Sequence, residues 1–162
     1  MKMRKHLCLA LTLGAAICLS TKAQESALEK LVIENDVVQI SSPEDFQNFA
    51  TVVNSGTKNL NAVLTQDVNL DVIGTESYLK NYSGTFDGQF NTLTYNAKDM
   101  GDNWGLFQTM SGTIKNLRVS GSITTLNTTN AGLVCSLAGG TLRNIYCDVN
   151  ITSTGGTDSL VE

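Results

Sequence analysis

A short pattern of small, polar and apolar residues recurs along the middle of the chain. The tripeptide Gly-Thr-apolar occurs at residues 84–86, 112–114 and 140–142, so that its glycines recur with a spacing of 28. A second marker, Gly105-Leu106-Phe107, recurs with a spacing of 27 as Gly132-Leu133-Val134 and Ser159-Leu160-Val161. Two markers with nearly the same period predict a repeat array.

Each repeat has short alternating apolar segments and turn residues, without an amphipathic helix. A unit of this length cannot bury its apolar side chains alone, but stacked units bury them in a continuous column. The pattern therefore predicts an all-β fold, a parallel β-helix in which equivalent residues of successive turns lie about 4.8 Å apart. The predicted inward columns are Phe86, Ile114 and Leu142, and Leu106, Leu133 and Leu160.

A third aligned position carries Gly88, Asn116 and Asn144. Glycine and asparagine tolerate left-handed backbone conformations, so this position predicts a tight bend between two strands. Asn116 and Asn144 are also expected to form a ladder of amide hydrogen bonds. The first repeat departs from the pattern after Gly88, and we expect a bulge or one-residue shift there.

The stretch before the repeats contains one well-marked helix, at residues 41–56. Ser42 is the expected N-cap, followed by Pro43 and, three positions after the cap, by Asp45. Gly56 is the expected left-handed residue at the end. An apolar stripe, which predicts a face that docks on the core and makes this a capping helix, consists of Phe46, Phe49, Ala50 and Val53.

The segments around this helix are less regular. Residues 24–40 are expected to form a lead-in, helical around Ala27 to Ile33, and a short strand at Val37 to Ile40. The repeats are assigned to residues 57–162, and residues 61–72 within them predict one or two strands with a bend near residues 66–67. The last unit is incomplete at Glu162, so we expect further repeats or a partner to cover an exposed edge.

Residues 1–23 have the pattern of a secretory signal peptide. A basic start is followed by the apolar run from Leu7 to Leu19, which is short for a membrane span, and cleavage is predicted before Gln24. This predicts export to the cell surface or the extracellular space, with the periplasm as an alternative. A lipoprotein signal acylated on Cys18 is disfavoured because bulky Ile17 precedes the cysteine.

Charge then limits the classes of partner. Four of the 11 basic residues lie in the signal segment, which leaves 7 basic against 15 acidic residues. Such an acidic chain should repel nucleic-acid phosphates and anionic membrane surfaces. Neither nucleic acid nor a membrane-spanning role is therefore predicted.

The sequence offers little for catalysis or metal binding. His6 is the chain's one histidine and belongs to the signal segment, which excludes Ser-His-Asp and Cys-His mechanisms from the mature chain. The acidic residues considered as catalytic groups are more typical of solvated turn residues than of paired carboxylates: Asp67, Asp71, Asp87, Asp99 and Asp102. Asp99 and Asp102 also lack the spacing of a calcium loop. No catalytic residue, cofactor or metal is predicted.

Two features are candidates for glycan contact. Lys115 and Arg143 align with Asp87 in one outward column, and Arg118 lies nearby, so these residues form either a basic patch for an acidic glycan or a solubilising face. Trp104 stands at the end of a loop, where its ring could stack on a sugar if exposed; the alternative is that it covers the core edge.

Cys135 and Cys147 remain in the mature chain after the signal segment is removed. An exported protein permits a disulfide between them. Both cysteines lie in predicted strands at different positions of the repeat, which favours unpaired, buried thiols.

The repeats resemble a known family. The stretch Tyr82-Ser83-Gly84-Thr85-Phe86-Asp87-Gly88, with Gly105-Leu106-Phe107 and residues 112–117, is similar to the GLUG-motif repeats of secreted bacterial surface proteins. The resemblance covers residues 37–162 and implies a pectate-lyase-like right-handed β-helix at the cell surface. Gln108 and Cys135 depart from it, since the motif normally closes with glycine there. The motif is structural, so no catalytic residue is carried over.

Together these observations predict a secreted or cell-surface β-helix scaffold, an adhesin-like protein that binds glycans and has no catalysis of its own. One alternative is an ancillary or partial domain of a carbohydrate-active enzyme, with its catalytic residues on repeats outside this chain. Another is a fragment without function of its own.

Overall fold

The computed structural model describes residues 22–73, 79–100, 104–125 and 131–153. Most of the predicted signal segment and Leu160 lie outside these ranges. The elements in chain order are α1 (Lys22–Lys30), β1 (Val32–Glu34), β2 (Val37–Ile40), α2 (Pro43–Asn54), β3 (Asn61–Leu64), β4 (Val68–Ile73), β5 (Thr85–Asp87), β6 (Thr92–Met100), β7 (Phe107–Met110), β8 (Thr113–Thr125), β9 (Val134–Leu137) and β10 (Thr141–Ser153). The all-β class is confirmed, with parallel pairing throughout except between β1 and β2.

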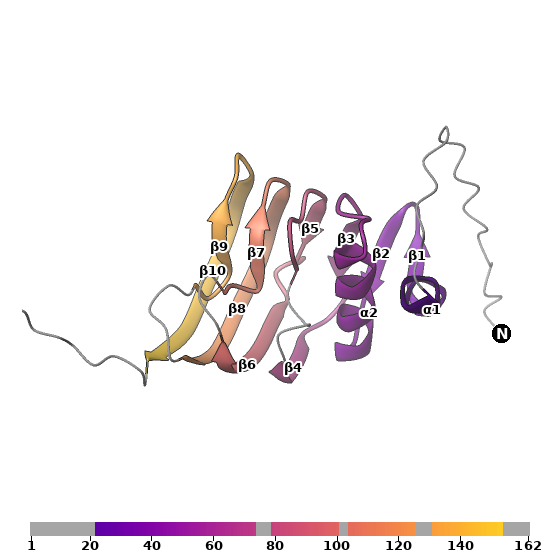
Figure 1. The fold of residues 1–162 in the computed structure, drawn as a ribbon. Helices are drawn as coiled ribbons and strands as arrows, with labels where there is room; N and C mark the ends of the chain where they lie inside the picture. The colour runs from indigo at the N-terminus through magenta and orange to yellow at the C-terminus, as the bar shows by residue number, and fades with distance from the viewer. Residues whose placement is uncertain (1–21, 74–78, 101–103, 126–130, 154–162) are drawn as a thin grey trace, which may run out of the picture.

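The strands lie side by side in a row from the N-terminal to the C-terminal end of the molecule (Figure 1). One sheet has the order β1-β2-β3-β5-β8-β6-β4, with β10 also paired to β8, and a second consists of β7 and β9. Thr85 pairs with Thr113, which pairs with Thr141, and Phe107 pairs with Val134. The predicted spacings of 28 and 27 are therefore the actual registers.

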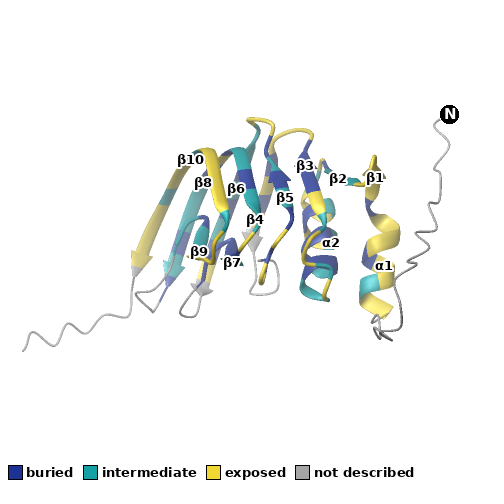
Figure 2. Cartoon of the chain, turned by 90° about the horizontal axis from the view of Figure 1, so that it is seen from above, coloured by how far each residue is buried: buried dark blue, intermediate teal, exposed yellow. Residues whose placement is uncertain are grey.

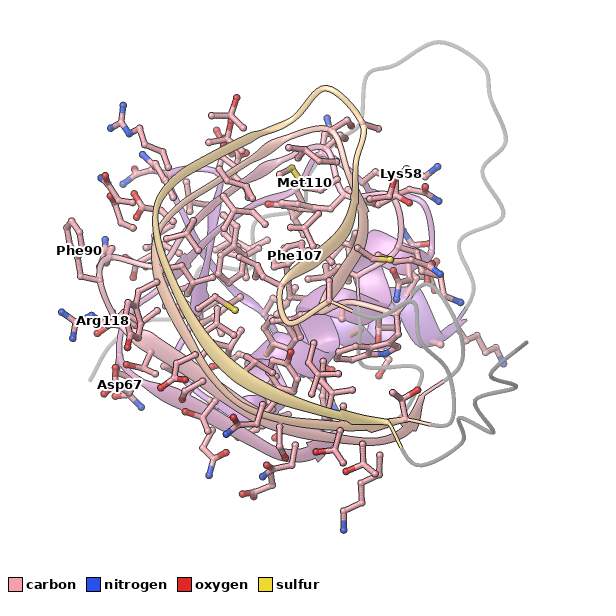
Figure 3. The ribbon with its side chains drawn as sticks, turned by 90° about the vertical axis from the view of Figure 1, so that its left-hand side faces the viewer. Lys58, Asp67, Phe90, Phe107, Met110 and Arg118 are labelled. Carbon is pink, nitrogen blue, oxygen red and sulfur yellow. The ribbon has the colours of Figure 1, made fainter. Side chains whose placement is uncertain are left out.

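Each later repeat passes three faces of the stack. In β8, the part before Asn116 pairs with β5 and the part after it pairs with β6, so that one long strand serves two faces. The third face holds β7 and β9, and isolated parallel bridges join Leu79 to Phe107 and Tyr82 to Met110. Seen from the β10 end, the chain encircles a core that includes Phe107 and Met110 (Figure 3). We call the consecutive strands of one repeat a layer, so that β7 with β8 forms one layer and β9 with β10 forms the next.

The bend predicted at Asn116 and Asn144 is confirmed. Both residues have left-handed backbone, with φ of 51° and 54°. The predicted amide ladder is present, because Asn144 Nδ2 donates to Asn116 Oδ1 at 2.8 Å. Asn116 Nδ2 in turn donates to Asp87 Oδ1 at 3.1 Å, so the ladder ends on a carboxylate.

The first repeat departs from the pattern by more than expected. Asp87 pairs with Lys115 and Thr92 with Arg118, so the first repeat has two more residues than the next one at this corner. The left-handed residues there are Gln89 and Phe90, with φ of 48° and 63°, and not Gly88. The irregularity expected after Gly88 is therefore present, but it is two residues long, and the bend predicted at Gly88 itself was wrong. The two extra residues form a turn that projects outward, with Phe90 exposed on it (Figure 3).

The predicted inward columns are buried at every described position except the last one of the first column. Phe86, Ile114 and Leu106 are fully buried, and Leu133 is 6% exposed. Leu142 stacks on Ile114 as predicted but is 42% exposed, because β10 pairs on one side with β8 and no described strand pairs with its other side.

Helix α2 begins where the sequence predicted. Ser42 Oγ accepts from the backbone N–H of Asp45 at 3.1 Å, while the Asp45 carboxylate accepts from the backbone N–H and hydroxyl of Ser41, each at 2.9 Å. Gly56 has φ of 128° beyond the helix end. The four residues of the predicted stripe are all fully buried, and the ring of Phe46 meets the ring of Phe86 edge-on at 6.4 Å. The helix thus docks on the N-terminal end of the core.

The lead-in was only partly predicted. The first helix ends at Lys30, and the following Val32–Glu34 is a strand antiparallel to β2, not a helical turn. The β-branched pair Val32 and Ile33 favours a strand. A turn at Asn35 and Asp36, both with positive φ, returns the chain to β2.

Candidate functional site

A shallow groove of about 560 Å³ lies on the outer face of strands β2, β3, β5 and β8. It runs across neighbouring strands, so its walls come from segments far apart in the sequence. Its lining is mostly polar and mixes amides, a hydroxyl, two carboxylates and one ammonium group. The lining residues are Glu34, Asn35, Val37, Gln39, Asn61, Ala62, Val63, Thr85, Asp87, Gln89 and Lys115.

Parallel pairing brings the groove residues into columns. Gln39 pairs with Val63, Val63 with Asp87, and Asp87 with Lys115, and the column continues to Arg143. Neighbouring strands in a sheet lie about 4.7–4.9 Å apart, so side chains of one column are in reach of each other. Their neighbours in the same strands, such as Phe86 and Ile114, face the core. In β5 and β8 the alternation of the strand thus places Asp87 and Lys115 on the groove side and Phe86 and Ile114 in the core.

Asp87 is the best-connected charged group of the groove. Lys115 Nζ lies 3.1 Å from its Oδ2, and the backbone N–H of Gln89 and the amide of Asn116 donate to its Oδ1 at 3.0 and 3.1 Å. Partial burial opposes ionisation, but these hydrogen bonds and the charge of Lys115 outweigh it and lower the pKa of Asp87. A general acid requires a raised pKa, so Asp87 is suited to hold a positive or hydrogen-bonding group and unsuited to donate a proton.

This lowered pKa makes stability depend on pH. Because the folded-state pKa lies below the unfolded value of about 3.9, Asp87 stabilises the fold above that value. We expect this contribution, at most about 1 kcal/mol for a partly exposed pair, to be lost as the pH falls from about 5 through the folded-state pKa. Urea unfolding at a series of pH values should therefore show the wild type losing more stability than Asp87→Asn. Parallel losses in the two proteins would contradict the prediction.

The three basic residues predicted as a patch do not act together. Lys115 lines the groove and is paired with Asp87. Arg143 stacks next to Lys115 in register, on the edge strand. Arg118 lies beyond the Asn116 bend, on a different face, and its side chain projects away from the core (Figure 3). Neither arginine lines the groove, so Lys115 is the member of the predicted set that the structure places in it.

Trp104 is not exposed and therefore cannot stack on a sugar, so the prediction of glycan contact by this residue was wrong. The alternative, in which the ring covers the core edge, agrees with the structure. Its side chain is 3% exposed, and its ring lies 5.6 Å from that of Tyr95. Its side chain belongs to the same buried hydrophobic cluster as that of Leu106, so the large ring covers the core edge. Tyr146 on β10 is instead the most exposed tyrosine of the described chain, at 64%.

The two cysteines are free, as favoured by their strand positions, but they are not buried thiols as predicted. Cys135 is half-buried and Cys147 is exposed. Cys147 belongs to β10, which pairs with β8 on one side and with no described strand on the other, and this explains the exposure. The remaining burial and the charge of Asp148 raise the pKa of the Cys147 thiol, which disfavours the reactive thiolate.

Two of the other acidic candidates make described hydrogen bonds, and one of them, Asp71, lies within strand β4 and not in a turn as expected. Asp67 Oδ1 accepts the backbone N–H of Thr92 at 2.7 Å, and the amide of Asn69 donates to Asp71 at 3.0 Å. The side chains of Asp99 and Asp102 lie outside the described part. Within the described ranges, no cluster of three metal-ligating residues and no helix long and apolar enough to cross a membrane is present.

Sequence reasoning missed most of the groove. Its first two strands, β2 and β3, stack with a spacing of 24 and carry no Gly-Thr marker. The same spacing of 24 connects Ala62 to Phe86. A search for a shorter period upstream of residue 84 would have aligned Val37, Asn61 and Thr85, and with them the groove.

Comparisons with protein-family models, with curated proteins and with solved structures found no match for this chain.

Proposed function

We propose that this chain is a right-handed parallel β-helix exported to the cell surface or beyond, where it acts as a scaffold that binds glycans and catalyses nothing itself. The observation that carries the proposal is the groove across β2, β3, β5 and β8, whose amide, hydroxyl and paired charged groups lie in register on paired strands. Sugar hydroxyls both donate and accept hydrogen bonds, and this lining offers both kinds of partner.

The fold part of the proposal rests on the parallel registers and on the resemblance to GLUG repeats. A stack whose successive turns pass the same three faces supports a β-helix with α2 as its N-terminal cap. Surface location rests on the signal-like pattern of residues 1–23. A scaffold also fits the Asn116–Asn144 ladder, which stiffens one corner of the stack.

The non-catalytic part rests on the electrostatics of Asp87. A glycoside hydrolase uses one carboxyl group with a raised pKa and a second carboxylate at a set distance. Asp87 has a lowered pKa and already pairs with Lys115. We therefore expect no release of reducing or unsaturated ends when the exported chain is incubated with polysaccharides; such release, lost in Asp99→Asn or Asp102→Asn, would favour the enzyme alternative.

Binding in the groove is tested with two matched variants on the same strand. Lys115→Ala removes a charged donor from the groove, whereas Arg118→Ala removes an exposed charge beyond the Asn116 bend. A hydrogen bond to a charged group contributes about 1.5–3 kcal/mol, so Lys115→Ala should weaken binding of a glycan-array hit about tenfold or more. Arg118→Ala should leave it unchanged.

The measurement is a titration of the best array ligand by calorimetry, with each variant first shown to unfold cooperatively. Equal affinities for wild type and Lys115→Ala would contradict binding in this groove. A loss of affinity confined to Arg118→Ala would place the glycan on the neighbouring face instead.

A further inference from the structure

The corner that follows strand β5 carries an exposed aromatic ring. Phe90 lies there with 60% of its surface exposed, and its ring points away from the core (Figure 3). The corresponding bends in β8 and β10 are made by one left-handed asparagine each, Asn116 and Asn144. In the first repeat the bend has two extra residues. Phe90 therefore belongs neither to the repeating pattern nor to the core.

The backbone of this turn is strained. Gln89 and Phe90 have φ of 48° and 63°, in the left-handed region. That region is unfavourable for residues other than glycine, asparagine and aspartate, and a bulky residue there is an outlier. The exposed ring also lacks the burial that normally stabilises an aromatic side chain. Strained residues cluster at ligand-binding positions, so strain and exposure together favour a contact between this ring and a ligand.

Hydrogen bonds hold the turn at the rim of the groove. Gln89 lines the groove, and its backbone N–H donates to Asp87 Oδ1 at 3.0 Å. The backbone N–H of Phe90 donates to the carbonyl oxygen of Asn116 at 2.6 Å. Asn116 directly follows Lys115, which lines the groove and pairs with Asp87. The exposed ring is therefore fixed next to the charged pair of the groove.

The groove and the ring together match the two kinds of surface on a sugar. Hydroxyl groups surround a sugar ring, and its faces carry C–H groups. The groove offers hydrogen-bonding side chains to the hydroxyl groups, including Gln39, Asn61 and Thr85. The phenyl ring of Phe90 offers an apolar surface to one face. Because the groove crosses β2, β3 and β5, which follow one another in the row (Figure 2), an extended oligosaccharide fits it better than a single sugar.

The charges of the groove narrow the class of sugar. Its lining includes the carboxylates of Glu34 and Asp87 and a single ammonium group, that of Lys115. This ammonium group is already paired with Asp87 at 3.1 Å. Like charges brought together in a complex are unfavourable, so a uronic acid should bind more weakly than a neutral sugar of the same length.

We propose that Phe90 is the sugar-stacking residue of the groove, and that the ligand is a neutral oligosaccharide. One sugar ring lies on the phenyl ring, and the sugars beside it form hydrogen bonds along the groove. This inference rests on the proposed glycan binding and adds the class of ligand and the side chain that selects it. Phe90 takes the role that the sequence suggested for Trp104, whose ring is buried.

The test titrates the exported chain by calorimetry with hexasaccharides of matched length. The neutral probes are cellohexaose, mannohexaose and N-acetylated chitohexaose, and the acidic probe is hexagalacturonate. We expect at least one neutral probe to bind saturably and hexagalacturonate to bind about tenfold more weakly or not at all. Phe90→Ala should weaken binding of that neutral probe about fivefold or more, whereas Phe90→Trp should retain it. Arg118→Ala, an exposed change beyond the Asn116 bend, should leave it unchanged.

Two further measurements separate a contact with sugar from a structural role of the ring. In Phe90→Trp, the emission of the new indole should shift to shorter wavelength as the sugar covers it, while buried Trp104 gives a constant background. Phe90→Gly accepts the left-handed backbone without strain. This variant should therefore unfold at the same or a higher urea concentration than the wild type and still lose binding.

Equal affinities of the wild type and Phe90→Ala, with the loss in Lys115→Ala intact, would overturn this inference and leave the groove as a glycan site. Tighter binding of hexagalacturonate than of every neutral probe would also overturn it. Absence of saturable binding of every neutral probe up to about 1 mM would reject the neutral class. In that case an acidic array ligand that still depends on Lys115 would support the groove, whereas no array ligand at all would reject the groove as well.

Discussion

Replacing Phe86 by alanine is expected to lower the free energy of unfolding by about 3–5 kcal/mol, the usual cost of removing a buried aromatic ring. The side chain is fully buried where helix α2 meets the stack. Its ring centroid lies 6.4, 6.1 and 5.5 Å from those of Phe46, Phe49 and Phe107. The substitution therefore removes a side chain that contacts both helix α2 and strand β7. The helix would have to leave its position on the core, or the strand its pairing, to fill the cavity.

The chain provides a matched control in Phe90, four positions later and 60% exposed on the two-residue turn. Phe90→Ala should change stability by less than about 0.5 kcal/mol, as for most surface substitutions. Urea unfolding followed by circular dichroism measures both. A cost for Phe86→Ala below about 1 kcal/mol, the typical effect of a point substitution, or equal costs for the two variants, would contradict a core built around this ring.

The same pair of phenylalanines shows what the repeat pattern could predict. Phe86 belongs to a tripeptide that recurs twice, and recurrence at a fixed spacing determines which residues share a column, so its burial followed from sequence. Phe90 lies in the two-residue insertion after Gly88, where the pattern is lost. The length of this turn depends on how two faces of the stack meet in space. The repeat pattern in the sequence does not determine that geometry.

The candidate groove was less predictable than the core. Asp87 and Lys115 were expected to stack because they align within the repeat, and they form an ion pair at 3.1 Å. Gln39 and Asn61 were not found, because their strands follow a different spacing and are separated by helix α2. The sequence also could not predict whether Trp104 is buried, because a ring at this position can pack on the core or point into solvent. In the structure it packs against the ring of Tyr95.

The glycines of the tripeptide were noticed for their recurrence, but their physical role is a close approach of backbones. A Cβ added to Gly112 would overlap the carbonyl oxygen of Gly84, and one added to Gly140 would lie 2.8 Å from the carbonyl oxygen of Gly112. Those carbonyl groups accept hydrogen bonds between layers: Thr113 N–H donates to Gly84 at 2.9 Å, and Thr141 N–H donates to Gly112 at 2.8 Å. The recurring glycine therefore allows the backbones of successive layers to approach closely enough to form these hydrogen bonds.

Gly112→Ala is accordingly expected to cost about 3 kcal/mol or more, at the upper end for overpacking, because the added methyl group meets rigid backbone rather than a flexible side chain. To relieve the overlap, the layer of β7 and β8 must move away from β5, which weakens the hydrogen bond from Thr113 to Gly84. Ser111→Ala, an exposed change at the preceding residue, should stay within about 0.5 kcal/mol of the wild type.

Urea unfolding measures the loss of stability for Gly112→Ala and for Ser111→Ala. Hydrogen exchange of the Thr113 and Thr141 amides shows which junction between layers is weakened. Faster exchange at Thr113 than in the wild type, with the amides of β2 and β3 unaffected, is expected if the strain is confined to this junction. A cost for Gly112→Ala no larger than that for Ser111→Ala would contradict the close approach. Because that approach is repeated at Gly84 and Gly140, the same result would remove the physical reason for glycine at the first position of the tripeptide in every layer.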